Sequence, residues 1–214
     1  RLDYGALRLY SLLGQHGVQF VDLMSIYLKA RSSGEDLYCK SDAHWSPRGA
    51  LLAARELSRR IKALDWYSSV PKTNFATANE TLRFTGDLVA RGEEHPGESH
   101  SVRVVKMPDG SFIPANSDSP VLIIGDSHSL VFHEGGTMLS RGSGLFDQLA
   151  SELGFAPDLI GIRGSGATAS RVSLMRKNRQ DPSWLSGKKI IVWCLSEREF
   201  SAAASNWRIV PIAP

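Results

Sequence analysis

The 214-residue sequence has few cysteines and no long apolar run. Its two cysteines, Cys39 and Cys194, lie far apart, so they allow either one disulfide or two buried thiols and leave the redox compartment open. No stretch approaches the roughly 20 apolar residues that a membrane-spanning helix requires, so we expect the folded part not to be embedded in a bilayer. The sequence also begins without Met or a signal-type apolar segment. Such a start is typical of a portion of a longer chain, with any export signal or anchor outside it.

Patterns for binding metals and nucleic acids are also missing. There is no His-x-x-x-His pair and no closely set Cys/His cluster, so a metal site is disfavoured. The residues that offer ligand atoms for one are Asp42, His44, His128 and His133. Lys and Arg number 25 against 22 Asp and Glu, a mild basic bias, and the basic run at 176–179 has no interleaved aromatic residues. This pattern is typical of a solvated helix face, so no nucleic-acid partner is expected.

The composition is that of an ordinary globular protein, with 42% apolar and 22% charged residues, and the length suits one domain over 1–214. Strands and helices alternate in the second half. The expected elements are strands at 121–125, 158–162 and 188–195 and helices at about 143–154 and 168–179. This alternation predicts an α/β fold with a mainly parallel sheet covered on both faces. Ligands of such sheets bind beyond the carboxyl ends of the strands.

The first half of the sequence is less regular. Four segments are expected in turn: a helix at 4–17, a strand at 18–23, a helix through Lys29 and an extended segment at 36–45. Ser46 as N-cap and Pro47 at the first helical position then predict a helix to about residue 64. Several Pro and Gly residues within 66–119 predict a loop-rich insertion with a small hairpin. This insertion is either a substrate-covering excursion or plain surface decoration.

The stretch VLIIGDSHSL at 121–130 presents a candidate nucleophile. Gly125 permits a sharp turn after the buried strand, which projects the Ser127 hydroxyl beyond the carboxyl end of the strand and at the amino end of the next helix. Free N–H groups at that place favour a developing oxyanion. The alternative is that Asp126 or Ser127 merely caps the helix.

Asp42 and His44 form a candidate pair for activating such a serine, whose hydroxyl needs a nearby base that a third group orients. Two residues apart on an extended backbone, their side chains point to the same side. The carboxylate can then bind one ring nitrogen and direct the other toward a serine. The alternative is a loop before a helix, with Asp42 exposed and His44 partly buried beside Trp45.

Together these motifs resemble a known family. The segment KSDAHWSPRGA at 40–50, followed by IIGDSHS at 123–129, is similar to the alginate O-acetyltransferase group, the AlgJ and AlgX type of SGNH-hydrolase-like domain. The resemblance implies a flavodoxin-like three-layer α/β sandwich in which the catalytic motifs occur in permuted order, since Asp and His precede Ser. It also implies that Asp42, His44 and Ser127 are the orienting acid, the base and the nucleophile of a Ser-His-Asp triad.

The sequence departs from that group at Asp126, which matches the hydrolase branch better and leaves both transfer and hydrolysis open. No Gly-x-Asn-Asp block supplies an oxyanion-stabilising Asn, so the N–H groups from Gly164 to Gly166 are the expected substitute, although a glycine loop is also typical of a plain turn. Trp45 either stacks on a sugar or fills the gap beneath the following helix. Arg198 is a further candidate for substrate binding, because its segment is similar to one near the end of these domains.

The resemblance implies a serine-dependent O-acetyltransferase that moves an acetyl group onto hydroxyls of an extracytoplasmic polysaccharide through an acetyl-serine intermediate. It implies a polysaccharide acceptor and an acetyl donor that comes from a membrane-bound O-acyltransferase partner, with no tightly bound cofactor. A periplasmic or other extracytoplasmic location is expected. Two alternatives stay open: a carbohydrate acetyl esterase, in which water replaces the sugar, and a non-catalytic polysaccharide-binding component.

Overall fold

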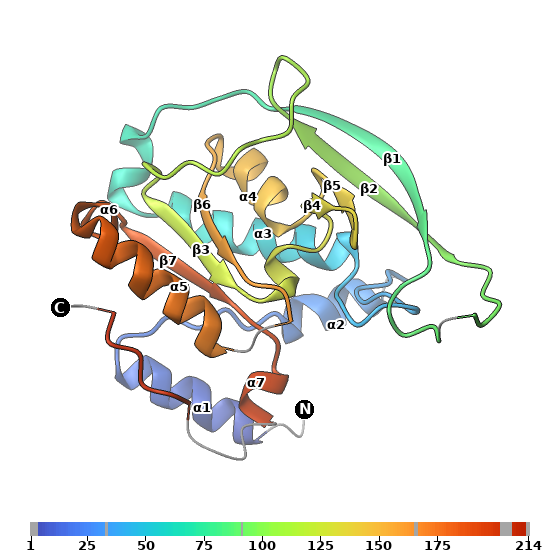
Figure 1. The fold of residues 1–214 in the computed structure, drawn as a ribbon, viewed down its shortest axis with the longest axis horizontal. Helices are drawn as coiled ribbons and strands as arrows, with labels where there is room; N and C mark the ends of the chain where they lie inside the picture. The colour runs from blue at the N-terminus through green and yellow to red at the C-terminus, as the bar shows by residue number, and fades with distance from the viewer. Residues whose placement is uncertain (1–3, 33, 91, 165–166, 202–206, 213–214) are drawn as a thin grey trace.

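A three-stranded parallel sheet lies at the centre of the molecule (Figure 1), in a computed structural model that describes residues 4–32, 34–90, 92–164, 167–201 and 207–212. Its strands, in the order β6-β3-β7, are β6 (Asp158–Gly161), β3 (Val121–Gly125) and β7 (Ile190–Cys194). Gly125 pairs with both Gly161 and Cys194, so the carboxyl ends of the strands meet at one edge of the sheet. The predicted α/β class with a parallel sheet is confirmed.

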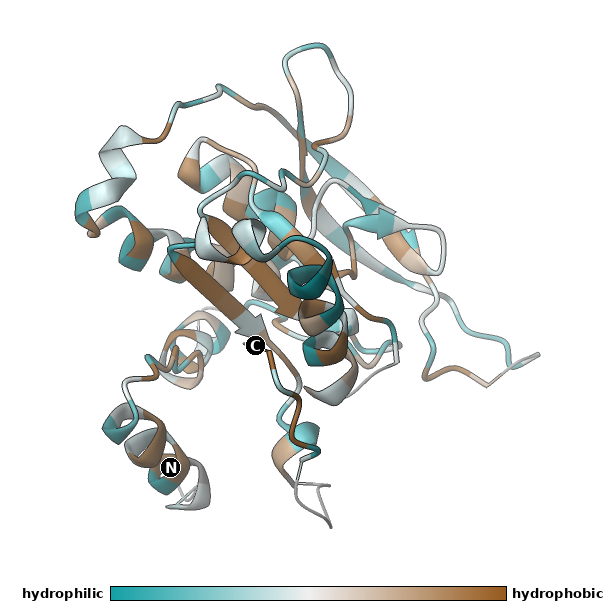
Figure 2. Ribbon diagram, turned by 60° about the vertical axis from the view of Figure 1, so that its left-hand side comes forward, coloured by the Kyte–Doolittle hydropathy of each residue, from teal (hydrophilic) through white to brown (hydrophobic). Residues whose placement is uncertain are grey.

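Side chains of β3 alternate between two cores. Val121 and Ile123 pack in the core that the helices at 47–62 (α3) and 145–153 (α4) supply. Leu122 and Ile124 pack in a smaller core with side chains of the helices at 167–180 (α5) and 182–186 (α6). Figure 2 shows these central strands as hydrophobic, which is the property that requires helices on both faces of a parallel sheet. The covering helices are α3 (Pro47–Lys62), α4 (Leu145–Leu153), α5 (Ala167–Gln180) and α6 (Pro182–Ser186).

The helix α3 begins where the sequence predicts. Pro47 is its first residue, and the Ser46 hydroxyl accepts a hydrogen bond from the Gly49 N–H at 3.1 Å. The N-cap Ser46 is fully buried, and its hydroxyl also donates to the Asp36 carbonyl at 2.7 Å. These bonds fix the entry of the chain into α3 and therefore the end of the segment that carries Asp42.

The N-terminal part contains two helices, α1 (Tyr4–Gln15) and α2 (Met24–Ser32), as predicted, but no strand lies between them. The expected strand at 18–23 is wrong because this segment meets no partner strand and serves as a connector. The Phe20 ring stacks on Tyr10 of α1, and the Phe20 carbonyl accepts a hydrogen bond from Arg60 at 3.0 Å. Among the described residues, no helix is long and apolar enough to cross a membrane.

The segment 66–119 is more ordered than expected. A 3-10 turn, η1 (Asp65–Ser69), precedes an antiparallel hairpin of β1 (Ala76–Phe84) and β2 (Glu98–Lys106), in register from Ala76↔Lys106 to Phe84↔Glu98. The sequence hides β1 because most of its residues are exposed and polar, and the Pro-Asp-Gly turn follows β2 rather than joining the two strands. The valines of β2 are buried, and Val105 packs in the α3/α4 core. This packing supports our proposal that the insertion and the sheet form one domain.

The remaining elements follow β3. A short hairpin joins β4 (Glu134–Gly135) to β5 (Met138–Arg141), and α7 (Arg198–Ser201) follows β7. Figure 1 shows the β1–β2 hairpin beside α4, with the connection between its strands reaching toward the segment that precedes α3. Two loops far apart in sequence therefore approach the same place, next to the carboxyl edge of the sheet.

Candidate active site

The segment before α3 turns back on itself. Tyr38 and Trp45 form an isolated antiparallel bridge, and the Cys39 N–H donates to the His44 carbonyl at 3.1 Å. The expected extended segment is therefore wrong, because the backbone reverses between Cys39 and His44. Asp42 and His44 do point toward one another, but they converge through a turn in which the Asp42 side chain bonds the backbone two residues on, rather than through strand alternation.

The Asp42 carboxylate orients the His44 ring. Its Oδ1 accepts hydrogen bonds from the His44 Nδ1–H at 2.6 Å and from the His44 backbone N–H at 3.1 Å, and its Oδ2 accepts from the Asp87 N–H at 3.3 Å. Burial would raise the pKa of Asp42, but these hydrogen bonds and the His44 ring hold the pKa below its ordinary value. Because the ionised carboxylate takes Nδ1–H, the assigned tautomer leaves a lone pair on Nε2.

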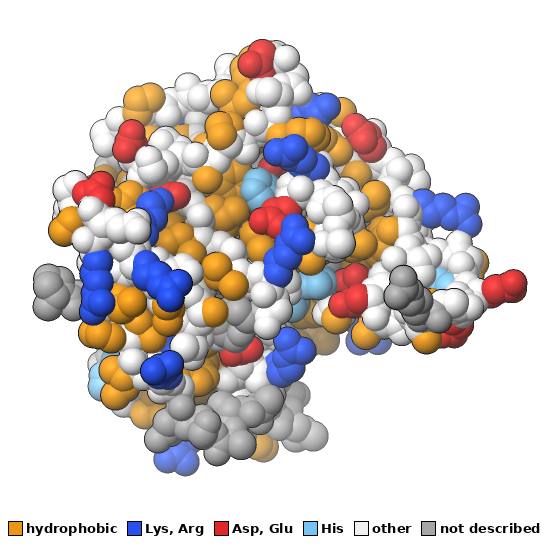
Figure 3. Space-filling view, in the orientation of Figure 1, with side chains coloured by type: hydrophobic (Ala, Val, Ile, Leu, Met, Phe, Trp, Pro, Cys, Tyr) orange, Lys and Arg blue, Asp and Glu red, His pale blue; other side chains and the backbone are white. Residues whose placement is uncertain are grey.

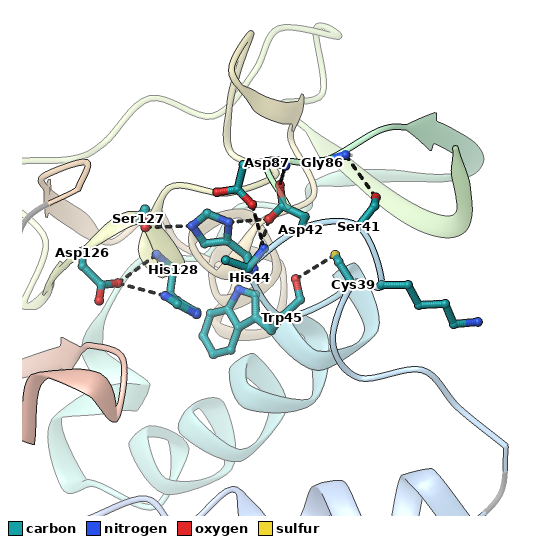
Figure 4. Close-up of polar contacts among 12 residues, drawn as sticks. Cys39, Ser41, Asp42, His44, Trp45, Gly86, Asp87, Asp126, Ser127 and His128 are labelled. Carbon is teal, nitrogen blue, oxygen red and sulfur yellow. Dashed lines mark hydrogen bonds and ion pairs between the residues drawn. The ribbon is translucent and has the colours of Figure 1, made fainter. Parts of the chain in front are cut away.

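That lone pair faces the candidate nucleophile. Ser127 Oγ lies 2.7 Å from His44 Nε2, so its hydroxyl donates to the ring, and Figure 4 shows Ser127, His44 and Asp42 joined in one line of hydrogen bonds. Asp42 and His44 are only 5% and 7% exposed, which shields their pairing from competing water. In the space-filling view, histidine side chains lie at the head of a hollow beside the lobe that carries the β1–β2 connection (Figure 3). The structure therefore brings Ser127 together with Asp42 and His44, although 83 positions separate His44 from Ser127 in the sequence.

The turn that presents Ser127 differs from the expectation. Only a 3-10 turn, η2 (Ser127–Ser129), follows β3, whereas the sequence suggested a full helix. The reason is that the chain leaves directly into the β4–β5 hairpin, and α4 begins at Leu145. Gly125 is required at this point because a Cβ there would overlap the Cys194 carbonyl of β7.

The Asp126 side chain holds this turn in place through hydrogen bonds to the backbone. Its carboxylate accepts hydrogen bonds from the His128 N–H and from the Ser196 N–H, both at 2.9 Å. Burial would raise the pKa of Asp126, but the His128 ring and these N–H groups hold it below its ordinary value. The capping role considered for Asp126 is therefore present, and it coexists with a Ser127 hydroxyl that remains directed at His44.

Backbone amides near Ser127 can hold an oxyanion. Within the described residues, no acceptor bonds the Ser127 N–H. Gly164, with φ +60°, lies in the loop that follows β6, so it comes from the strand next to β3. Gly166 lies outside the described residues. The Ser127 amide is thus a donor available for the expected oxyanion site, and a contribution from Gly164 stays a prediction.

The other two predicted contact residues differ in burial, and the substrate-binding role of Arg198 stays a prediction. Trp45 is 5% exposed and packs in the α3/α4 core, with its ring edge-on to His128 at 5.6 Å. Its faces are covered, so the expected stacking on a sugar is wrong, and the alternative of a gap filled beneath α3 holds. Arg198 is exposed at the start of α7, two residues beyond Ser196, and it contacts none of the three aligned side chains.

In the described part of the chain, two groups of side chains have atoms close enough to share a metal ion. One is Asp42, His44 and Asp87, and the other is Cys39, Glu98 and His100. In the first, His44 is already bonded to Asp42 and faces Ser127. In the second, Glu98 accepts from His100 at 2.8 Å, and the Cys39 thiol, whose pKa burial raises, donates to the Trp45 carbonyl at 3.5 Å. Both cysteines are free thiols.

Sequence reasoning missed the residues that hold the turn. Gly86, Asp87 and Glu98 lie in the segment assigned to a loop-rich insertion, and no periodicity or spacing connects them with Asp42. The Asp87 and Glu98 carboxylates accept hydrogen bonds from backbone N–H groups of residues 40, 41 and 43, and the Gly86 and Asp87 N–H groups donate to Ser41 and Asp42. Such contacts leave no pattern in the sequence, because every residue except proline offers the same donor.

Several known proteins are similar to this chain in sequence. The curated relatives include the alginate biosynthesis protein AlgX of Pseudomonas fluorescens, 22% identical over 168 residues (74% of this chain, 32% of the relative). They also include the probable alginate O-acetylase AlgJ of the same species, 24% identical over 119 residues (50% of this chain, 30% of the relative). The chain thus spans about a third or less of the length of these relatives.

Solved structures show the same fold. The O-acetyltransferase domain of Pseudomonas putida AlgJ matches 92% of this chain and 66% of that chain, with a TM-score of 0.65 and 18% identity. Pseudomonas aeruginosa AlgX matches 91% of this chain and 45% of that chain, with a TM-score of 0.61 and 18% identity. The family model described as "SGNH hydrolase-like domain, acetyltransferase AlgX" matches residues 4–153, a span that includes Asp42, His44 and Ser127. The chain therefore belongs to the AlgX family of SGNH-hydrolase-like acetyltransferase domains.

Proposed function

We propose that this chain is a serine-dependent O-acetyltransferase that acts on hydroxyl groups of an extracytoplasmic polysaccharide, with alginate as the acceptor that the relatives' names suggest. The observation that carries the proposal is the continuous line from the Asp42 carboxylate through His44 to the Ser127 hydroxyl, with both contacts at 2.7 Å or less. An acid, an imidazole and a hydroxyl in this order activate a serine for acyl transfer.

The first half-reaction transfers acetyl to the enzyme. His44 Nε2 takes the proton as Ser127 Oγ attacks the acetyl carbonyl carbon of the donor. The Ser127 N–H and the loop at Gly164 stabilise the oxyanion of the tetrahedral intermediate. When the intermediate collapses, the bond to the donor's leaving oxygen breaks and His44 returns the proton to that oxygen, which leaves acetyl-Ser127. Asp42 stabilises the imidazolium that exists between the two proton transfers.

The second half-reaction repeats these steps with a sugar. A sugar hydroxyl gives its proton to His44 and attacks the acetyl carbonyl, and Ser127 leaves as its oxygen regains the proton. The product is an acetylated sugar and free enzyme, in a ping-pong cycle. We further propose that the donor is supplied by a membrane-bound O-acyltransferase partner and that the reaction takes place in the periplasm or another extracytoplasmic compartment.

One observation favours a second candidate, a carbohydrate acetyl esterase. The residue before the nucleophile is Asp126, as in the Gly-Asp-Ser turn of hydrolases, and the same three side chains serve when water replaces the sugar. The two candidates differ only in which hydroxyl reaches acetyl-Ser127.

We expect an acceptor to divert acetyl from water. With a chromogenic acetyl ester as donor, adding unacetylated alginate oligosaccharide should convert released free acetate into acetylated oligosaccharide in proportion to acceptor concentration. The measurement is the ratio of acetyl-sugar to free acetate by mass spectrometry, with an oligosaccharide whose hydroxyls are fully blocked as the matched control. A ratio that stays at zero at saturating acceptor would establish the esterase instead.

A further inference from the structure

The β1–β2 hairpin contacts the turn that carries Asp42 at two places. Gly86 and Asp87 bond it from the connection between the strands (Figure 4), and Glu98 bonds it from the start of β2. We propose that Asp87 and Glu98 are positioning residues that hold the Asp42–His44 pair in line with Ser127, so that the β1–β2 hairpin is part of the catalytic apparatus. The inference rests on the proposed function, because it assigns a role in the alignment of that same triad. It adds a third interpretation of the insertion to a cover for substrate and surface decoration.

The first contact is made by Gly86 and Asp87. The Asp87 carboxylate accepts the Ala43 N–H at 2.9 Å, while its own N–H donates to Asp42 Oδ2 at 3.3 Å. The Gly86 N–H donates to the Ser41 hydroxyl at 3.0 Å. A Cβ on Gly86 would overlap both Asp42 and the Ser41 carbonyl, so only glycine allows the two chains to lie this close. The loop therefore bonds the catalytic acid itself and the residues on both sides of it.

The second contact is made by Glu98, the first residue of β2. Its carboxylate accepts four hydrogen bonds, from the Lys40 N–H and Ser41 N–H at 2.9 Å, the Ser41 hydroxyl at 2.5 Å and His100 Nε2 at 2.8 Å. The Glu98 side chain is 8% exposed. Burial would raise the pKa of Glu98, but the N–H groups, the hydroxyl and His100 lower it to about 2. Glu98 is thus an ionised acceptor that is surrounded only by donors.

The turn needs these two contacts because it contains no regular secondary structure. Between Cys39 and His44 no strand ladder or helix satisfies the backbone, and a free segment of this kind samples many conformations. Asp87 and Glu98 supply acceptors for the N–H groups of three of the four residues at 40–43. Since His44 reaches Ser127 only when Asp42 holds its ring, a looser turn misaligns the base without removing any member of the triad.

Asp87→Ala tests the first contact, with Asp87→Asn as the conservative variant. We expect Asp87→Ala to lower kcat about 10- to 100-fold with KM for a chromogenic acetyl ester nearly unchanged. Asp87→Asn should recover most of kcat, because its amide oxygen still accepts the Ala43 N–H. Rates are normalised to the sites that a serine-directed phosphonate labels at completion, so that lost folded protein does not count. Asp109→Ala is the matched control: Asp109 bonds Ser111 in the exposed turn after β2 in the same way, and its loss should leave kcat unchanged.

Glu98→Gln tests the second contact through the Tm of the protein and its dependence on pH. The side-chain amide of this variant would turn an N–H group toward other donors, so we expect a lower Tm and a lower kcat than in the parent. Because the pKa of Glu98 lies at about 2 instead of 4.5, its carboxylate stabilises the fold fully above about pH 4.5, and this stabilisation disappears as the pH falls toward 2. The Tm difference between parent and variant should therefore shrink from pH 7 to about pH 3.

The outcomes separate this inference from the proposed function. A phosphonate-normalised kcat for Asp87→Ala equal to that of the parent, or no recovery in Asp87→Asn, would overturn the positioning role of Asp87. A Tm difference for Glu98→Gln that is independent of pH would overturn the role of Glu98. In either case Ser127→Ala would still be inactive. If Ser127→Ala keeps full activity, the proposed function itself fails.

Discussion

Ser127→Ala should abolish acetyl transfer, with a loss in kcat of about 10⁴-fold or more and no covalent labelling by a serine-directed phosphonate. The reason is that no second hydroxyl can take its place. Ser129, the nearest alternative in the motif, is fully buried, and its hydroxyl donates to the Asp126 carbonyl at 2.6 Å. Activity is measured as acetyl-oligosaccharide formed, and folding is checked by comparing Tm with the parent, since loss of one hydroxyl at the surface of the turn costs little stability.

Ser129→Ala is the control for this experiment. It removes a hydroxyl two residues away and should keep both labelling and acetyl transfer. The comparison also tests the third interpretation of the chain, a polysaccharide-binding component without catalysis. If Ser127→Ala acetylates or supports acetylation as well as the parent does, the chain works by binding and the account given above is incorrect.

Asp42→Asn should lower kcat by about 10²- to 10⁴-fold while KM stays close to the parent value. Asp42 Oδ1 accepts both from His44 Nδ1–H and from the His44 N–H. An amide at this position either presents N–H groups to the ring or supports it without charge, so the tautomer with a free Nε2 is no longer enforced and the imidazolium loses its counter-charge. A base in the wrong tautomer cannot take the proton of Ser127.

The double variant separates a catalytic effect from a general disturbance. Because Asp42 acts through His44 on Ser127, adding Asp42→Asn to Ser127→Ala should cause almost no further loss of activity. Losses that multiply in the double variant would show that Asp42 contributes by another route, such as the folding of the turn. Steady-state kinetics with the chromogenic ester give the activities, and the Tm of each variant reports the folding of the turn.

The central sheet was predictable because burial on both faces leaves a clear pattern. Every residue of β3 is buried, so the segment at 121–125 is apolar at each position and needs no context to be identified. The start of α3 was equally clear, since Ser46 and Pro47 satisfy local rules for an N-terminus. In these cases the physical cause lies within a few residues of its effect.

The elements that were not predicted depend on distant partners. The strand β1 is mostly exposed and polar, and it exists because it pairs with β2 along nine residues. The segment at 18–23 has the composition of a strand, but no partner lies beside it. The 3-10 turn after Gly125 ends because the chain must enter the β4–β5 hairpin. Local propensity cannot supply this information.

The candidate site divides in the same way. Asp42, His44 and Ser127 were found because two short motifs carry them, and the resemblance links the motifs. Asp87 and Glu98 were missed because their partners are backbone N–H groups 44 and 57 residues away. The assignment of Trp45 to substrate failed for a related reason, since a tryptophan in sequence does not reveal whether its face is covered.

The most direct test of the account is the fate of the acetyl group in a single turnover. The parent protein is mixed with the chromogenic acetyl ester, quenched in acid within the first turnover and digested, and the peptide that contains Ser127 is analysed by mass spectrometry. We predict one acetyl group on Ser127, formed at least as fast as the chromophore is released and lost when an alginate oligosaccharide is added. Chromophore release without acetyl on Ser127 at any quench time, or acetyl on another residue that transfers to the sugar, would contradict it.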